Sequence, residues 1–129
     1  ALRKSYAVAG VQAEILDFID DMPRRYADAD LVICRAGAIT VSELTAAGVA
    51  SILVPFMASS TSHQKENAQW LAEKNAAIYL PQTALSPQVL AEQLTALNRS
   101  QCLKMAETAY TLGQREASAN IAQILESLA

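Results

Sequence analysis

One stretch of the sequence, residues 31–48 (LVICRAGAITVSELTAAG), combines residue types that could bind a phosphate and a sugar. Four apolar residues lead into Arg35 and Gly37, and a segment with helical spacing follows, which Gly48 is predicted to end. This pattern predicts a strand, a tight glycine turn and the N-terminus of a helix. Because the first N–H groups of a helix have no partner within the helix, they favour an anion. The turn is therefore a candidate diphosphate site.

Glu43 supplies a carboxylate further along the same predicted helix. Thr40 and Glu43 have the spacing of a capping box, which predicts Thr40 at the helix start. A carboxylate repels phosphate, but it can accept hydrogen bonds from two adjacent ribose hydroxyls. Two simpler interpretations stay open, because such a turn is often only a connection and such a glutamate is often only a capping residue. Arg35 could pair with a phosphate, with Glu43 or with Asp30.

A second polar group opens the helix predicted for residues 63–75. His63 and Asn67 are four residues apart and are expected to share a helix face, with Gln64 beside them. Imidazole and amide groups that face a crevice suit a ligand with several hydroxyls. The alternative is that they are solvated polar residues at a helix start.

The order of the predicted elements indicates an α/β fold, with a parallel sheet wrapped by helices. The predicted strands are residues 13–19, 31–34, 51–55 and 76–80. The strand at 31–34 is a continuous apolar run, so we expect it to be buried on both faces. Ligands bind such sheets at the carboxyl ends of the strands. The segments expected to converge there on one ligand are residues 18–19, 35–40 and 56–64.

Helices are predicted at both ends of the chain. Residues 1–10 have the pattern of a helix closed by a glycine, and a C-terminal tail of three helices is expected after the last strand. Ser86 is predicted to cap the first helix of this tail, and the others are predicted at residues 100–112 and 117–128. Leu103 and Tyr110 are spaced for burial.

Composition narrows the classes of function. The chain has 129 residues, 52% of them hydrophobic and 18% charged, as is ordinary for one globular domain. A net charge of −3 and few aromatic residues argue against nucleic-acid binding. No apolar run approaches the ~20 residues that span a bilayer. Metal-binding, serine-hydrolase and P-loop motifs do not occur, so we expect neither a metal nor a cofactor.

Four segments together resemble the C-terminal domain of the MurG family: FIDDM, residues 29–48, VPF and HQKENAQWL. The enzymes of this family transfer N-acetylglucosamine (GlcNAc) from UDP-GlcNAc to lipid I, which makes lipid II in bacterial peptidoglycan synthesis. The resemblance implies the Rossmann-like, donor-binding half of an inverting GT-B glycosyltransferase. It extends over nearly the whole chain.

The resemblance also implies roles for individual residues. Ile19 lies against the uracil through its backbone, and Glu43 binds the ribose hydroxyls. The residues implied to hold the diphosphate are Gly37, Ala38, Ile39 and Thr40. Those implied to reach the GlcNAc hydroxyls are His63, Gln64 and Asn67. Ala36 stands where the family often has a serine, which removes one possible hydroxyl contact.

Departures from the family pattern lead us to expect only part of the enzyme. A GGS-x-G diphosphate loop is missing, as is the N-terminal domain with its acceptor site, candidate base and membrane-facing patch. We therefore expect residues 1–129 to form a partial UDP-sugar-binding domain without its first βαβ unit, inactive alone. The parent enzyme would work on lipid I as a peripheral protein at the cytoplasmic face of the bacterial membrane. The alternatives are a donor-binding subunit of a two-chain transferase and a non-catalytic nucleotide-binding module.

The strands that are missing from the family pattern predict an open sheet edge. In a sheet of order 3-2-1-4-5-6, strands 1 and 2 would separate the strand at 13–19 from the strand at 31–34. Without them, residues 31–34 would form an exposed apolar edge. Either the strand at 13–19 moves across, or a second copy of the chain pairs with the edge. We expect self-association.

Overall fold

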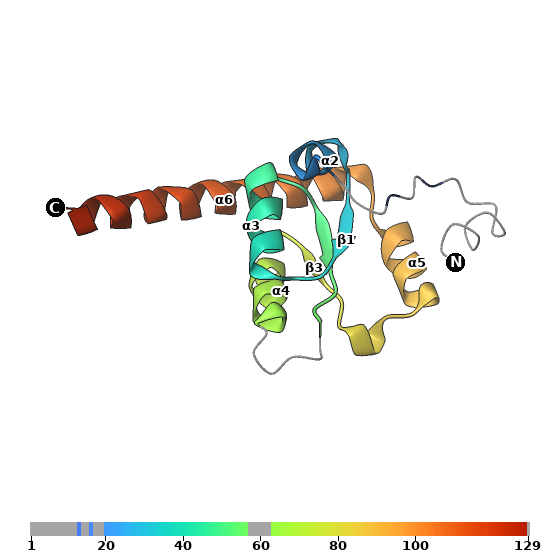
Figure 1. The fold of residues 1–129 in the computed structure, drawn as a ribbon. Coiled ribbons are helices and arrows are strands. Elements are labelled where there is room, and N and C mark those ends of the chain that lie inside the picture. Colours follow the sequence, from blue (N-terminus) through green and yellow to red (C-terminus); the bar gives the residue numbers. More distant parts are fainter. Residues whose placement is uncertain (1–12, 14–15, 17–19, 57–62, 129) are drawn as a thin grey trace.

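The computed structural model describes residues 13, 16, 20–56 and 63–128, with side chains described up to residue 113. The predicted helix at residues 1–10 lies outside the described residues, as does almost all of the predicted strand at 13–19. The elements, shown in Figure 1, are α2 (Met22–Asp28), β1 (Val32–Cys34), α3 (Ala38–Ala47), β2 (Ser51–Leu53), α4 (Gln64–Glu73), β3 (Ile78–Tyr79), the 3₁₀ helix η1 (Gln82–Ala84), α5 (Pro87–Ala96) and α6 (Arg99–Leu128).

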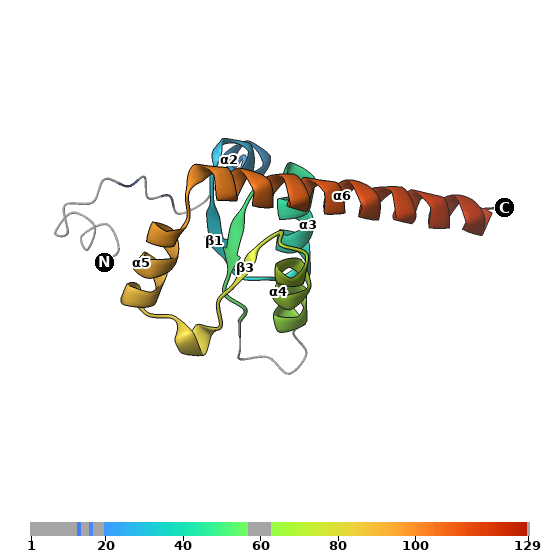
Figure 2. The same cartoon turned by 180° about the vertical axis from the view of Figure 1, so that it is seen from behind.

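The three strands form a parallel sheet in the order β1-β2-β3. Ile33 is aligned with Ile52, and Leu53 with Tyr79. Helices alternate with these strands along the chain. Helices α3 and α4 lie on one side of the sheet and α5 lies on the other, as Figures 1 and 2 show from opposite directions. The predicted α/β fold with a parallel sheet wrapped by helices is confirmed.

Strand β2 lies between two apolar layers and is fully buried. Leu53 faces α3 and α4, where Leu44 and Leu71 pack against the same cluster. Ile52 faces the other side, where Val89 of α5 packs. Apart from Ser51, the residues of this central strand are apolar because both of its faces are covered.

The expectation that strand β1 is buried on both faces is wrong. Ile33 is 44% exposed, whereas Ile52 beside it on β2 is completely buried. Among the described residues, strand β1 is one of the two outer strands of the sheet, and α5 covers the Ile52 side without enclosing Ile33. Val32 and Cys34 point to the other side and pack against the α3–α4 layer. The expectation that residues 31–34 form a sheet edge agrees with this strand order.

The two predicted tail helices at residues 100–112 and 117–128 are one helix, α6, so their separation was wrong. The helix continues through Gly113, because a glycine within a helix costs only about 1 kcal/mol relative to alanine. Packing of α6 against α3 offsets that cost. A Cβ atom at Gly113 would lie 2.5 Å from the Thr45 carbonyl oxygen, so glycine allows the close approach. No helix of the described residues is both long and apolar enough to span a membrane.

The buried stripe of α6 is also displaced from the predicted one. Leu103 is 59% exposed and Tyr110 is 51% exposed, whereas Ala109 is buried. The close approach to α3 selects small residues on the contacting face. Tyr110 lies beside Gly48, where an added Cβ atom would come within 2.8 Å of the Tyr110 Cβ atom.

Two predicted helix ends are confirmed. Gly48 follows α3 with a φ of 69°, a left-handed conformation that favours glycine. The Ser86 side chain accepts a hydrogen bond from the Val89 N–H at the start of α5. Both helix ends could be predicted from the sequence because each depends on residues that are close together in the chain.

Substitution of Gly113 by alanine tests the contact between α6 and α3. Helix propensity alone predicts that Gly113→Ala stabilises the protein, but the new methyl group would collide with the Thr45 carbonyl. We expect the free energy of unfolding to fall by about 1–3 kcal/mol in chemical denaturation. Gly37→Ala is the control, because a Cβ atom there lies 3.8 Å from its nearest neighbour. A stabilised Gly113→Ala protein would contradict the close packing.

Candidate functional site

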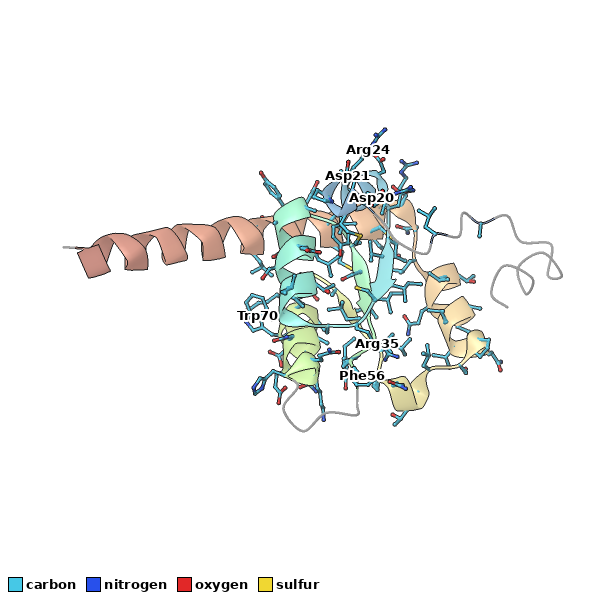
Figure 3. The ribbon with its side chains drawn as sticks, in the orientation of Figure 1. Asp20, Asp21, Arg24, Arg35, Phe56 and Trp70 are labelled. Atoms are coloured by element: carbon cyan, nitrogen blue, oxygen red, sulfur yellow. The ribbon has the colours of Figure 1, made fainter. Side chains whose placement is uncertain are left out.

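The segments that follow β1 and β2 meet at one end of the sheet. Arg35 Nη1 donates to the Val54 carbonyl at 3.3 Å and to Gln82 Oε1 at 2.8 Å. Its guanidinium carbon lies 5.6 Å from the centre of the Phe56 ring, and Figure 3 shows the two residues together. These hydrogen-bond partners are neutral, so none of them offsets the positive charge of the guanidinium at this end of the sheet. Within the described residues, Arg35 pairs with neither Glu43 nor Asp30, two of the alternatives left open by the sequence.

Helix α3 begins directly after the glycine turn. Its N-cap is Gly37, which has no side chain that could cap the helix. The Val41 N–H donates to the Gly37 carbonyl at 2.9 Å. The predicted capping box is therefore wrong, since Thr40 is the third residue of the helix. The chain turns helical as soon as it leaves the extended backbone of Gly37. Among the described residues, no side chain accepts a hydrogen bond from the first-turn N–H groups of Ala38, Ile39 and Thr40.

Helix α4 braces this turn from the side. Asn67 Nδ2 donates to the Ala36 carbonyl at 3.0 Å. Gln64 Oε1 accepts from the Phe56 N–H at 2.7 Å, and Gln64 Nε2 lies 3.8 Å from the Cβ position of Gly37. The two amide side chains thus connect α4 to the segments that follow both strands.

His63 does not join this brace. It is the N-cap of α4, so the helical spacing rule does not place it on one face with Asn67. Its side chain is 83% exposed, and Nδ1 lies 3.9 Å from a Glu66 carboxylate oxygen. The structure therefore brings Gln64 and Asn67 to the glycine turn, whereas the His63 side chain points into solvent at the start of α4.

Glu43 shares a groove with the start of α3. The groove has a volume of about 370 Å³, and its lining residues are Ala38, Ile39, Ser42, Glu43 and Ala46. Glu43 comes five residues after Ala38, which corresponds to about 7.5 Å along the helix axis. The first-turn N–H groups and a carboxylate are thus reached from one face of α3, at a spacing suited to the phosphate and the vicinal hydroxyls of one nucleotide.

Tyr26 is a candidate residue that the sequence reasoning missed. Its hydroxyl donates to Glu43 Oε2 at 3.1 Å, and its ring is buried in the core. Burial, and then the hydrogen bond to Glu43, raise the pKa of Tyr26 to about 12, so the phenol remains a donor at neutral pH. Tyr26 and Glu43 are 17 residues apart on different helices. No sequence spacing signals such a pair.

The remaining expected segment, residues 18–19, lies outside the described residues. In Figure 3, Asp20 and Asp21 lie at the end of the sheet opposite Arg35 and Phe56. The described residues of the segments after β1 and β2 therefore meet, whereas convergence on one ligand and the role of Ile19 stay predictions.

The family model of the glycosyltransferase family 28 C-terminal domain matches residues 2–125. This match covers almost the whole chain. The chain belongs to glycosyltransferase family 28.

Similar proteins of glycosyltransferase family 28 are considerably longer than this chain. The chain is 66% identical to a protein of Janthinobacterium sp. (strain Marseille) and 64% identical to one of Herminiimonas arsenicoxydans. Both are named UDP-N-acetylglucosamine--N-acetylmuramyl-(pentapeptide) pyrophosphoryl-undecaprenol N-acetylglucosamine transferase. The matches cover 99% and 98% of this chain but 36% of each relative. The chain thus spans about a third of the length of these relatives.

A solved structure supports the same assignment. The chain is similar to Acinetobacter baumannii MurG, with a TM-score of 0.74 and 42% sequence identity. The similarity covers 80% of this chain and 30% of that one. The parallel sheet and its helices therefore have the Rossmann-like architecture of the C-terminal MurG domain, as the sequence resemblance implied.

The bracing role of Asn67 can be tested with an isosteric substitution. Asn67→Asp keeps the shape of the side chain but replaces the N–H donor by an acceptor facing the Ala36 carbonyl. We expect a loss of about 1–3 kcal/mol in the free energy of unfolding, measured by denaturant titration.

Asn98→Asp is the matched control for this substitution. Asn98 Oδ1 accepts from the Gln101 N–H, and a carboxylate retains that acceptor. Its stability should therefore stay close to that of the unmodified chain. Equal stability of the Asn67 and Asn98 variants would contradict the brace.

Proposed function

We propose that this chain is the donor-binding part of an inverting glycosyltransferase, which transfers GlcNAc from UDP-GlcNAc to lipid I and so makes lipid II. Membership of family 28 and the names of the similar proteins support the reaction. The observation that carries the proposal is the groove on α3, because it joins the uncapped helix start to the Glu43 carboxylate. That pairing suits a nucleoside diphosphate.

The diphosphate would lie at the start of α3. Gly37 has no side chain to compete for the first-turn N–H groups of Ala38, Ile39 and Thr40, and the helix dipole favours negative charge there. Arg35, with only neutral partners among the described residues, adds a positive charge at the same sheet edge.

The ribose would lie against Glu43. An ionised carboxylate can accept one hydrogen bond from each of two adjacent hydroxyls, and such charge-assisted bonds are stronger than neutral ones. The same carboxylate would repel a phosphate. Glu43 therefore fixes the direction of the nucleotide along α3, with its phosphates toward Gly37. The uracil would lie beyond the ribose, where the family resemblance assigns Ile19.

The GlcNAc would lie near the start of α4. His63 is exposed at the N-cap, and Gln64 is close to Gly37. Because Gln64 and Asn67 also brace the glycine turn, their substitution would weaken the binding of UDP as well as the selection among UDP-sugars. Truncation of His63, in contrast, would change the selection among UDP-sugars without weakening the binding of UDP.

The acceptor would be bound elsewhere in the full-length protein. Inverting transfer needs a base that activates the acceptor hydroxyl. We propose that this base, the lipid I site and the contact with the cytoplasmic face of the membrane belong to the two thirds of the relatives that this chain does not match. The same region would pair with the edge of β1, where Ile33 is exposed. The predicted self-association would then occur only when the 129-residue chain is separated from that region.

Substitution of Glu43 tests the proposed function. We expect Glu43→Ala to weaken the binding of UDP by about 2–3 kcal/mol, or roughly 30- to 150-fold, because two charge-assisted hydrogen bonds are lost. The loss should be much smaller for 2′-deoxy-UDP, which has one hydroxyl fewer. Isothermal titration with the two nucleotides measures both effects.

Glu73→Ala is the control, because it removes an exposed carboxylate at the end of α4, outside the groove. It changes the net charge equally and should leave both affinities unchanged. If the Glu43 variant prefers UDP over 2′-deoxy-UDP as strongly as the unmodified chain does, the proposed ribose contact is wrong.

A further inference from the structure

The hydrogen bond between Tyr26 and Glu43 links a buried side chain to an exposed one. The Tyr26 ring is 6% exposed and belongs to the core cluster that includes Leu44 and Val49. Its position is therefore fixed by packing on several sides. Its hydroxyl emerges beside Glu43, on the neighbouring helix, and donates to Oε2 at 3.1 Å.

Glu43 has no other hydrogen bond or ion pair within the described part of the chain. A glutamate on a helix surface samples many rotamers, and ordering it when a ligand binds costs free energy. A single donor fixed in the core removes much of that freedom before binding. The carboxylate has about four acceptor positions, so one bond from Tyr26 leaves the others for a diol.

The surroundings favour this contact over other partners. Glu43 lines both the groove at the start of α3 and a cleft of about 300 Å³ between α2 and α3. The other residues of the cleft are Pro23, Tyr26, Ala27, Ala46 and Ala47, which supply mainly apolar surface. Among the side chains that line this cleft, the Tyr26 hydroxyl is therefore the hydrogen-bond donor available to the Glu43 carboxylate.

We propose that Tyr26 is a positioning residue, which holds the Glu43 carboxylate ready to accept hydrogen bonds from the vicinal hydroxyls of the nucleotide ribose. This inference rests on the proposed function, because it assumes that Glu43 binds a ribose. It adds a residue of α2 to a site otherwise formed by α3 and α4. Tyr26 itself does not touch the ligand.

The test is a thermodynamic cycle that combines Tyr26→Phe with removal of a ligand hydroxyl. The binding of UDP and of 2′-deoxy-UDP to the full 129-residue chain is measured by isothermal titration. We expect Tyr26→Phe to lower the preference for UDP by about three- to tenfold, as the loss of one positioning hydrogen bond predicts. The affinity for 2′-deoxy-UDP should change much less. In a Glu43→Ala background, Tyr26→Phe should have no further effect.

Tyr79→Phe is the matched control. Tyr79 packs against the same core cluster, and its hydroxyl makes no hydrogen bond within the described residues. This variant loses the same atom but should keep the preference for UDP.

The outcomes separate the two proposals. If the unmodified chain prefers UDP but Tyr26→Phe keeps that preference, or weakens both nucleotides equally, the positioning role is wrong and the proposed function stands. If the unmodified chain shows no preference, the ribose contact of Glu43 fails, and the positioning role fails with it. If Tyr26→Phe does not fold, the hydroxyl serves to hold α2 on α3, which also overturns the positioning role.

Discussion

The hydrogen bond from Asn67 to the Ala36 carbonyl is the interaction on which the geometry of the site depends. Ala36 is completely buried, so its carbonyl needs a partner inside the protein. Asn67 supplies that partner from α4 and so fixes where β1 ends and α3 begins. Without it, the glycine turn would be free to shift. The position of the helix start, and hence of every group along the groove, follows from this one contact.

The positive and negative charges of the site lie apart. The positive end of the α3 dipole and Arg35 lie at the sheet edge, whereas the Glu43 carboxylate lies in the second turn of the helix. A nucleoside diphosphate has the matching arrangement, since its phosphates are charged and its ribose offers neutral donors. In the proposed function, this separation would let one short helix bind both parts.

The sequence predicted what neighbouring residues determine. Gly48 and Ser86 ended and capped their helices as expected, and the alternation of strands and helices predicted the parallel sheet. Helical spacing does place Glu43 on one face with Ile39, four residues before it, and both line the groove. Contacts between distant elements were missed. The capping box at Thr40 failed because the Gly37 turn, rather than local spacing, sets the helix start. Tyr26 and the brace at Asn67 depend on how α2 and α4 pack, which spacing along the chain does not reveal.

The groove on α3 is not the largest cavity of the described residues. A cavity of about 510 Å³, lined by residues that include Asp30, Gly48 and Leu103, lies where α6 passes the end of α3. Chemical-shift mapping of the ¹⁵N-labelled chain during titration with UDP would distinguish the two. The account predicts the largest shifts at the backbone amides of residues 38–40 and at Glu43. Shifts confined to the cavity beside α6, or no shifts at saturating UDP, would contradict it.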